Sequence, residues 1–311
     1  MSDAKPLDAE KNWVDRLPLK MRPYARMIRL DRPIGSWLLF IPCSWGLTLA
    51  AVTTGQSGQA PSGEWPSLYL LALFALGAVI MRGAGCIFND IVDRELDAQV
   101  ARTRQRPIPA GVIKVWQAWL FLFVMCALGL LILLQLDIAA IALGFMSIGP
   151  IALYPFMKRI TWWPQLFLGL TFNWGALMGY AAHQGSLDPA AIGLYAAGIF
   201  WTLGYDTIYA HQDREDDALA GIKSSARWLG AHTKTALVIF YSAALAALFY
   251  AAFIAGLSGA TLALLMLGGV HLFWQIYRLD IDNPALCLYL FKSNRNFGLY
   301  ITVAILSALY I

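Results

Sequence analysis

Long apolar stretches separated by short polar segments run through the chain. Nine of these stretches approach the roughly 20 residues that a helix needs to cross a bilayer, and they lie near 34–53, 67–87, 115–135, 138–156, 162–182, 189–209, 235–256, 259–277 and 296–311. The pattern predicts an all-α protein, a polytopic membrane bundle of nine transmembrane helices. The mixed apolar and basic segment 1–33 is expected to lie along the membrane interface, ahead of one transmembrane domain over 34–311.

Composition and charge support this prediction. Of the 311 residues, 59% are hydrophobic and 14% are charged, whereas soluble domains have about 45–50% apolar and about 25% charged residues. Lys and Arg gather in alternate connections, so the positive-inside rule places the N-terminus in the cytoplasm and the C-terminus on the other side. The net charge of +4 is thus a topology signal and requires no nucleic acid.

The charge distribution also bears on the compartment. Asp3, Asp8 and Glu10 lie in the first residues, and such acids argue against a mitochondrial transit peptide. We therefore expect a multi-pass protein of the bacterial inner membrane, in contact with the lipid bilayer and with its C-terminus in the periplasm.

The first polar motif follows the second apolar stretch. Asn89, Asp93 and Asp97 are four residues apart, and Asp90 lies beside them. On a helix this spacing forms one stripe. Stacked carboxylates need a compensating cation, and hard oxygen ligands suit Mg²⁺, which binds through one or two carboxylates plus substrate phosphates. All four residues are therefore candidate metal ligands.

A second acidic motif follows the sixth stretch. Asp213 and Asp217 repeat the four-residue spacing. Either motif alone is compatible with a solvated acidic loop. Two such motifs on the same side of a membrane bundle would hold metal ions with a diphosphate between them.

Basic residues accompany both motifs. Arg102, Arg104 and Arg106 follow the first motif, and Lys223 follows the second. Arg and Lys beside carboxylates and Mg²⁺ are what a diphosphate requires, although each of them also fits a topology charge. After the fourth stretch, Lys158 and Arg159 fit either an acceptor carboxylate or an interfacial anchor.

Two further polar residues lie inside apolar stretches. Asn173 is in the middle of the fifth stretch, and Asp206 is near the end of the sixth. Polar groups at such positions usually face the bundle interior and mark sites. Both are candidate substrate-binding residues.

At these residues the sequence resembles the UbiA superfamily of intramembrane aromatic prenyltransferases. Residues 89–97 match its NDxxDxxxD motif and 213–217 its DxxxD motif, and 30–35 and 106–111 are similar to two further family stretches. Within the superfamily, 154–159, 205–210 and 291–295 are similar to the members that prenylate 4-hydroxybenzoate in ubiquinone synthesis.

The resemblance implies helices around a central cavity, capped by cytoplasmic loops. It implies Mg²⁺ as cofactor, and polyprenyl diphosphate and 4-hydroxybenzoate as substrates. The ring carbon ortho to the hydroxyl would receive the polyprenyl chain. The expected catalytic residues are Asp93, Asp97, Asp213, Asp217 and Arg159. The expected substrate-binding residues are Arg102, Arg106, Lys158, Arg159, Lys223, Asn173, Tyr154 and Asp206.

Two alternatives stay open at this point. One keeps the enzyme class and changes the acceptor to homogentisate or a naphthoate. The other is a cation-binding transporter. Transporters usually place ionisable residues near the bilayer midplane, whereas here the carboxylates lie at the ends of apolar stretches.

Overall fold

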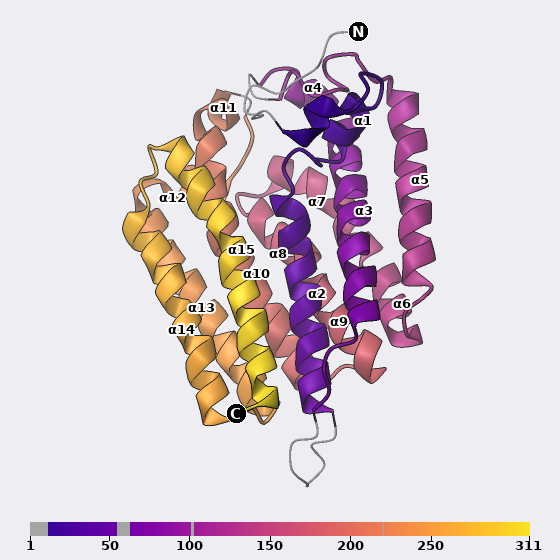
Figure 1. Ribbon diagram of the computed structural model, residues 1–311. Helices are drawn as coiled ribbons and strands as arrows, with labels where there is room; N and C mark the ends of the chain where they lie inside the picture. Colours follow the sequence, from indigo (N-terminus) through magenta and orange to yellow (C-terminus); the bar gives the residue numbers. More distant parts are fainter. Residues whose placement is uncertain (1–11, 55–62, 101–102, 220) are drawn as a thin grey trace.

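Helices form the regular structure of the chain, whose computed structural model describes residues 12–54, 63–100, 103–219 and 221–311, without the side chains at 216, 217 and 219. Within these ranges there is no strand, so the all-α prediction is confirmed. The long helices run side by side in one bundle (Figure 1). In chain order the helices are α1 (Arg22–Met27), α2 (Ile34–Thr53), α3 (Leu68–Val92), α4 (Arg94–Asp97), α5 (Val115–Leu133), α6 (Ile138–Met146), α7 (Ile148–Ile160), α8 (Pro164–Phe172), α9 (Trp174–Gln184), α10 (Pro189–Ala210), α11 (Arg214–Leu219), α12 (Ser225–Leu229), α13 (Thr233–Ile254), α14 (Gly259–Arg278) and α15 (Pro284–Leu306). The short 3-10 helices are η1 (Trp13–Arg16), η2 (His211–Asp213), η3 (Gly230–His232) and η4 (Ser307–Leu309).

Six helical segments are long and apolar enough to cross a membrane. They are Ile34–Thr53, Leu68–Val92, Val115–Leu133, Ile138–Ile160, Ser225–Ile254 and Gly259–Arg278. Their length and composition support a multi-pass membrane protein. The larger count of nine spans stays a prediction.

Several predicted boundaries differ from the helices. The fourth stretch divides into α6 and α7 at Ser147, and the fifth divides into α8 and α9 at Asn173. The bounds of the ninth stretch were wrong, because α15 begins at Pro284 rather than near 296. Asn283 caps this helix by accepting a hydrogen bond from the Leu286 N–H at 3.0 Å, so its polar first half is helical as well.

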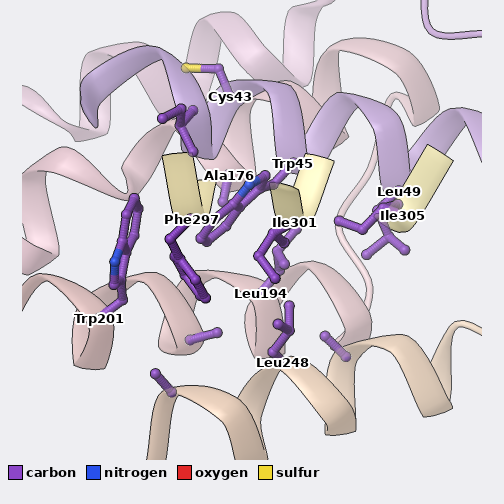
Figure 2. Packing of buried hydrophobic residues seen from close by; sticks show 14 of the residues in the cluster. Cys43, Trp45, Leu49, Ala176, Leu194, Trp201, Leu248, Phe297, Ile301 and Ile305 are labelled. Carbon is purple, nitrogen blue, oxygen red and sulfur yellow. The ribbon is translucent and has the colours of Figure 1, made fainter. Parts of the chain in front are cut away.

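Aromatic and aliphatic side chains together fill the core of the bundle (Figure 2). Trp45 of α2 and Trp201 of α10 lie with ring centroids 5.0 Å apart, and Phe297 of α15 is 5.4 Å from Trp201. Each indole N–H has a partner, since Trp45 donates to the Gly298 carbonyl and Trp201 donates to Asn294, both at 2.8 Å. The three helices are thereby fixed relative to one another.

Glycines let α2 and α9 approach closely. A Cβ on Gly46 would lie 2.0 Å from the Ala176 carbonyl oxygen, and a Cβ on Gly179 would lie 2.2 Å from that of Cys43. Small residues at such contacts are typical of helix packing in membranes, where close van der Waals contact replaces the hydrophobic effect.

The two ends of the bundle differ. At one end, called the motif end below, α1, α4 and α11 gather, and at the opposite end lies the C-terminus (Figure 1). A second apolar cluster supports the motif end. It joins Met27 of α1, Ile87 of α3, Ile108 of the loop before α5 and Ala118 of α5. The segment before α2 is therefore packed against the helix that carries the first acidic motif.

Candidate active site

The first acidic motif is helical apart from Asp93, which is a turn residue. Asn89 and Asp90 lie in the last turn of α3, Asp93 separates α3 from α4, and Asp97 ends α4. The Asp93 N–H donates to the Asn89 carbonyl at 2.9 Å, and the Asp97 N–H donates to the Asp93 carbonyl at 2.8 Å. The spacing of four residues therefore places Asn89, Asp93 and Asp97 on one face.

Two bases from α7 hold the carboxylate of Asp93, which is wholly buried. Lys158 Nζ lies 2.5 Å from Oδ2, and Arg159 Nη2 lies 3.2 Å from Oδ1. Arg159 also donates to the Val92 carbonyl at 3.1 Å. A buried carboxylate needs such partners, because an uncompensated charge in a low dielectric is destabilising.

Two arginines serve the other carboxylates of this motif. Arg29 Nη2 contacts Asp90 at 2.7 Å, and Arg106 Nη1 contacts Asp90 at 3.1 Å and Asp97 at 2.8 Å. Burial raises the pKa of Asp97, and Arg106 acts in the opposite direction. Sequence reasoning missed Arg29, which was counted only among the basic residues of the N-terminal segment.

The second motif lies on η2 and α11, directly after α10. His211 Nε2 is 3.0 Å from the Thr233 hydroxyl at the start of α13, and Arg214 pairs with Asp282 at 2.8 Å. Burial and, to a smaller extent, Arg214 lower the pKa of His211 to about 4. Asp213 is half-buried, whereas the side chain of Asp217 lies outside the described part.

The end of α7 connects the two motifs. The backbone N–H of Lys223 donates to the Lys158 carbonyl at 3.0 Å, and Lys223 Nζ donates to the Ile160 carbonyl at 3.0 Å. Lys158 itself contacts Asp93 of the first motif. The segment that follows the second motif is therefore linked to the first motif through a single residue, Lys158. Of the predicted bases, only Arg102 lies outside the described residues.

A further arginine lies inside the bundle. Arg82 of α3 donates through Nη1 to the Cys86 sulfur at 2.7 Å, and its Cζ lies 5.5 Å from the ring centroid of Phe172. Its Nε is buried without a hydrogen-bond partner among the described residues. Tyr154 and Asp206 lie within its electrostatic reach. Sequence analysis did not single out Arg82, although its place inside an apolar stretch was a signal of an interior role.

Asn173 lies at the break between α8 and α9. Its Nδ2 donates to the Gly169 carbonyl at 2.9 Å and to the Thr202 hydroxyl at 2.7 Å. Its Oδ1 is buried without a partner among the described residues. Asn173 thus joins the helix break to α10 at Thr202, one turn before Asp206. A substrate contact by Asn173 stays a prediction.

The donor set fits Mg²⁺ by its chemistry. Carboxylate oxygens and the amide oxygen of Asn89 are hard ligands, and the Asn89 side chain has no partner among the described residues. Those residues contain no preformed cluster of three metal-binding side chains. A site of this kind suits Mg²⁺, because this ion binds through one or two carboxylates and completes its shell with water and phosphate.

The profile of the UbiA prenyltransferase family matches residues 39–299. The chain therefore belongs to the UbiA prenyltransferase family, as the resemblance predicted.

Two relatives illustrate the match. The chain is 50% identical over 290 residues to a protein of Aedes aegypti named 4-hydroxybenzoate polyprenyltransferase, mitochondrial. The aligned region covers 93% of this chain and 64% of that protein. It is 47% identical over 293 residues to the Homo sapiens protein of the same name. That aligned region covers 94% of this chain and 76% of that protein. The chain thus spans somewhat less than two thirds of the mosquito protein.

Solved structures share the fold. A UbiA homologue from Aeropyrum pernix superposes with a TM-score of 0.67 at 22% identity, over 88% of this chain and 96% of that protein. A UbiA homologue from Archaeoglobus fulgidus, bound to GPP and Mg²⁺, superposes with a TM-score of 0.64 at 19% identity, over 92% of this chain and 99% of that protein.

The predicted compartment is wrong. These relatives are mitochondrial proteins, so the expectation of a bacterial inner membrane with a periplasmic C-terminus is overturned. It rested on acidic residues near the N-terminus and on loop charges. The positive-inside rule behind the second argument describes the orientation of helices in a membrane and does not identify the organelle. The multi-pass character is unaffected.

Proposed function

We propose that the chain transfers a polyprenyl group from polyprenyl diphosphate to 4-hydroxybenzoate and thereby acts in ubiquinone biosynthesis. The new bond forms at the ring carbon ortho to the hydroxyl, the allylic C–O bond breaks, and diphosphate and the ring proton leave. The observation that carries this proposal is the buried first motif, whose carboxylates meet bases from α7 and the loop before α5 at the mouth of an apolar bundle. The names of the relatives support the acceptor.

Asn89, Asp93, Asp97, Asp213 and Asp217 would hold Mg²⁺. When bound, Mg²⁺ would neutralise charge on the diphosphate. The choice of Mg²⁺ is supported by the structure of an Archaeoglobus fulgidus homologue bound to GPP and Mg²⁺.

The bases bind the diphosphate in this proposal. Lys158 and Arg159 hold Asp93 in the structure, and both donate equally well to phosphate oxygens. We propose that they turn from the carboxylate to the diphosphate when metal and substrate enter together. Arg102, Arg106 and Lys223 are proposed to contact the same anion.

Arg82 is proposed to bind the acceptor carboxylate. Its Nε has no protein partner among the described residues, and a guanidinium recognises a carboxylate through paired N–H donors. Its position above the Phe172 ring would also orient an aromatic acid. Tyr154, Asp206 and Asn173 are proposed to line the acceptor side of the same interior region.

The apolar interior excludes water from the reacting carbons. Departure of diphosphate leaves an allylic cation, which water would otherwise capture. Aromatic faces stabilise cations, and Tyr209 and Phe291 lie with ring centroids 4.5 Å apart beside the second motif. We further propose nine spans around a central cavity, with 34–311 as the transmembrane domain and 1–33 as an interfacial segment.

The test uses the purified chain in liposomes with Mg²⁺, prenyl diphosphates of several lengths and labelled 4-hydroxybenzoate. The expected product is 3-polyprenyl-4-hydroxybenzoate, with loss of at least 10²-fold in rate for Asp93→Asn or Asp213→Asn, as for other charge-stabilising groups. Glu95→Gln is the matched control, because Glu95 belongs to the first motif and its side chain is 81% exposed. Product from homogentisate or a naphthoate alone would overturn the acceptor, and no prenylated product would overturn the activity.

A further inference from the structure

Asp90 lies beside the stripe that Asn89, Asp93 and Asp97 form in the first motif, and not on it. It is wholly buried, and arginines occupy both of its oxygens. Arg29 Nη2 lies 2.7 Å from Oδ1 and 3.0 Å from Oδ2, and Arg106 Nη1 lies 3.1 Å from Oδ1. Arg29 neutralises the Asp90 carboxylate within the protein, as the α7 bases do for Asp93. What sets Asp90 apart is its place off the ligand stripe and its link to the segment before α2.

Arg29 is held in a strained backbone conformation. Its φ is 60°, in the left-handed region that non-glycine residues seldom adopt. The same guanidinium that binds Asp90 donates through Nη1 to the Arg26 carbonyl at 3.0 Å and the Met27 carbonyl at 3.3 Å. A strained residue persists where its surroundings over-determine it, and such residues gather at functional sites. Arg29 thus ties the end of α1 to the first motif.

Arg106 is the second partner of Asp90. One nitrogen, Nη1, bridges Asp90 at 3.1 Å and Asp97 at 2.8 Å. An arginine has five N–H donors, and its Nε and Nη2 have no partner among the described residues. The side chain is 16% exposed, so these donors are oriented but still reachable by a ligand.

We propose that Asp90 is a positioning residue, rather than a metal ligand, and that it and Arg29 hold Arg106 in place for the diphosphate. The segment containing η1 and α1 then belongs to the active site, because its residue Arg29 helps to position Arg106. Its anchor, Arg29, lies 61 positions before Asp90 in the chain. This inference rests on the proposed function, because the anion that Arg106 receives is the prenyl diphosphate.

The two roles for Asp90 make opposite predictions. If Asp90 bound metal, Arg29 would compete with the ion, and Arg29→Gln would strengthen metal binding. If Asp90 positions Arg106, Arg29→Gln and Asp90→Asn weaken binding of the diphosphate and leave metal binding unchanged.

The experiment uses the full chain in nanodiscs with five variants: Arg29→Gln, Arg29→Gly, Arg29→Lys, Asp90→Asn and the control Arg94→Gln. Arg94 belongs to the same motif but pairs with an exposed Glu95. The Gly variant removes the side chain and relieves the backbone strain, so it keeps the test valid if Arg29→Gln fails to fold. The probes are a non-cleavable prenyl thiodiphosphate for the dissociation constant, Mn²⁺ paramagnetic resonance for metal binding, and hydrogen exchange of α1 and the segment around it.

The expected result is a rise of about 10- to 100-fold in the dissociation constant of the thiodiphosphate for the Arg29 and Asp90 variants, as loss of a charge-assisted hydrogen bond produces. Mn²⁺ affinity should stay within about twofold, and α1 should exchange faster in Arg29→Gln, Arg29→Gly and Asp90→Asn. Arg29→Lys should recover part of the affinity, because it retains the charge. Arg94→Gln should resemble the wild type.

Weaker Mn²⁺ binding by Asp90→Asn together with stronger binding by Arg29→Gln would overturn the proposal. So would wild-type thiodiphosphate affinity in Arg29→Gly. A wild-type chain that prenylates no acceptor would refute the proposed function, whereas hydrogen exchange would still report the anchor between Arg29 and Asp90. Normal prenyl transfer with variants that match Arg94→Gln would refute the positioning role alone.

Discussion

Gly35→Ala should weaken acceptor binding while the bundle stays folded. Gly35 lies in the first turn of α2, against the side chain of Arg82. A Cβ at this position would lie 2.3 Å from Arg82 Nε and 3.0 Å from Cζ and Nη2. Unstrained contacts between heavy atoms lie at about 3.5–4.0 Å, so the guanidinium must move by about 1 Å.

The size of the effect on acceptor binding follows from the displacement of the Arg82 guanidinium. Overpacking costs about 1–3 kcal/mol in a rigid core, and a flexible arginine side chain reduces that cost. The displaced guanidinium loses its proposed hydrogen bonds to the acceptor carboxylate, which are worth about 1.5–3 kcal/mol. At about 1.4 kcal/mol per factor of ten, the KM for 4-hydroxybenzoate should rise about 10- to 100-fold.

The assay compares the KM of each substrate and the thermal midpoint of Gly35→Ala with those of Gly149→Ala. Gly149 is also helical, and a Cβ there meets nothing within 4 Å, so both variants share the gain in helix propensity. Arg82→Lys should show the same rise in acceptor KM, because an ammonium cannot pair with both carboxylate oxygens in the geometry of a guanidinium. An unchanged acceptor KM in Gly35→Ala, or a rise only in the KM of the prenyl diphosphate, would refute the role of Arg82.

Three further predictions concern the motif end. Lys158→Gln should raise the KM of the prenyl diphosphate about tenfold through loss of one charged contact and leave the acceptor KM unchanged. Initial-rate kinetics with Lys114→Gln as the control test this. Equal shifts in KM for both substrates would contradict it. Removal of Mg²⁺ by EDTA should abolish transfer but lower the thermal midpoint only slightly, because bases already neutralise the carboxylates of the first motif; a large fall would argue against that compensation. The pKa of His211 is lowered to about 4 in the folded protein. As the pH falls, the unfolded chain therefore takes up a proton at His211 before the folded chain does, and stability should fall as the pH drops from about 6.5 toward 4. Thermal unfolding across that range should show a smaller loss for His211→Gln than for the wild type.

The acidic motifs were readable because their spacing is local. Asn89, Asp93 and Asp97 follow the helical period, and the backbone hydrogen bonds of α3 and α4 preserve that period. Apolar length likewise predicted most helices. The start of α15 was missed because Lys292 and Arg295 interrupt its hydropathy, although the cap at Asn283 and the proline after it begin a helix there.

The partners of the carboxylates were not readable in the same way. Lys158 and Arg159 were candidates, but sequence position did not show that both meet Asp93. Arg29 and Arg82 were not among the candidates. Which base reaches which carboxylate depends on how α1, α3 and α7 pack, and side-chain contacts between distant segments have no periodic signature in the chain.

Patterns within the chain were enough to predict an apolar, helical membrane protein with two acidic motifs and bases beside them, because these features follow from bilayer thickness and from helix period. The pairing of the charges became visible once the helices were packed. The tertiary structure paired Asp93 with α7 and Asp90 with Arg29 and Arg106, and it placed Arg82 against Gly35 inside the bundle. The reason is that burial makes every charge require a partner, and folding alone decides which partner is within reach.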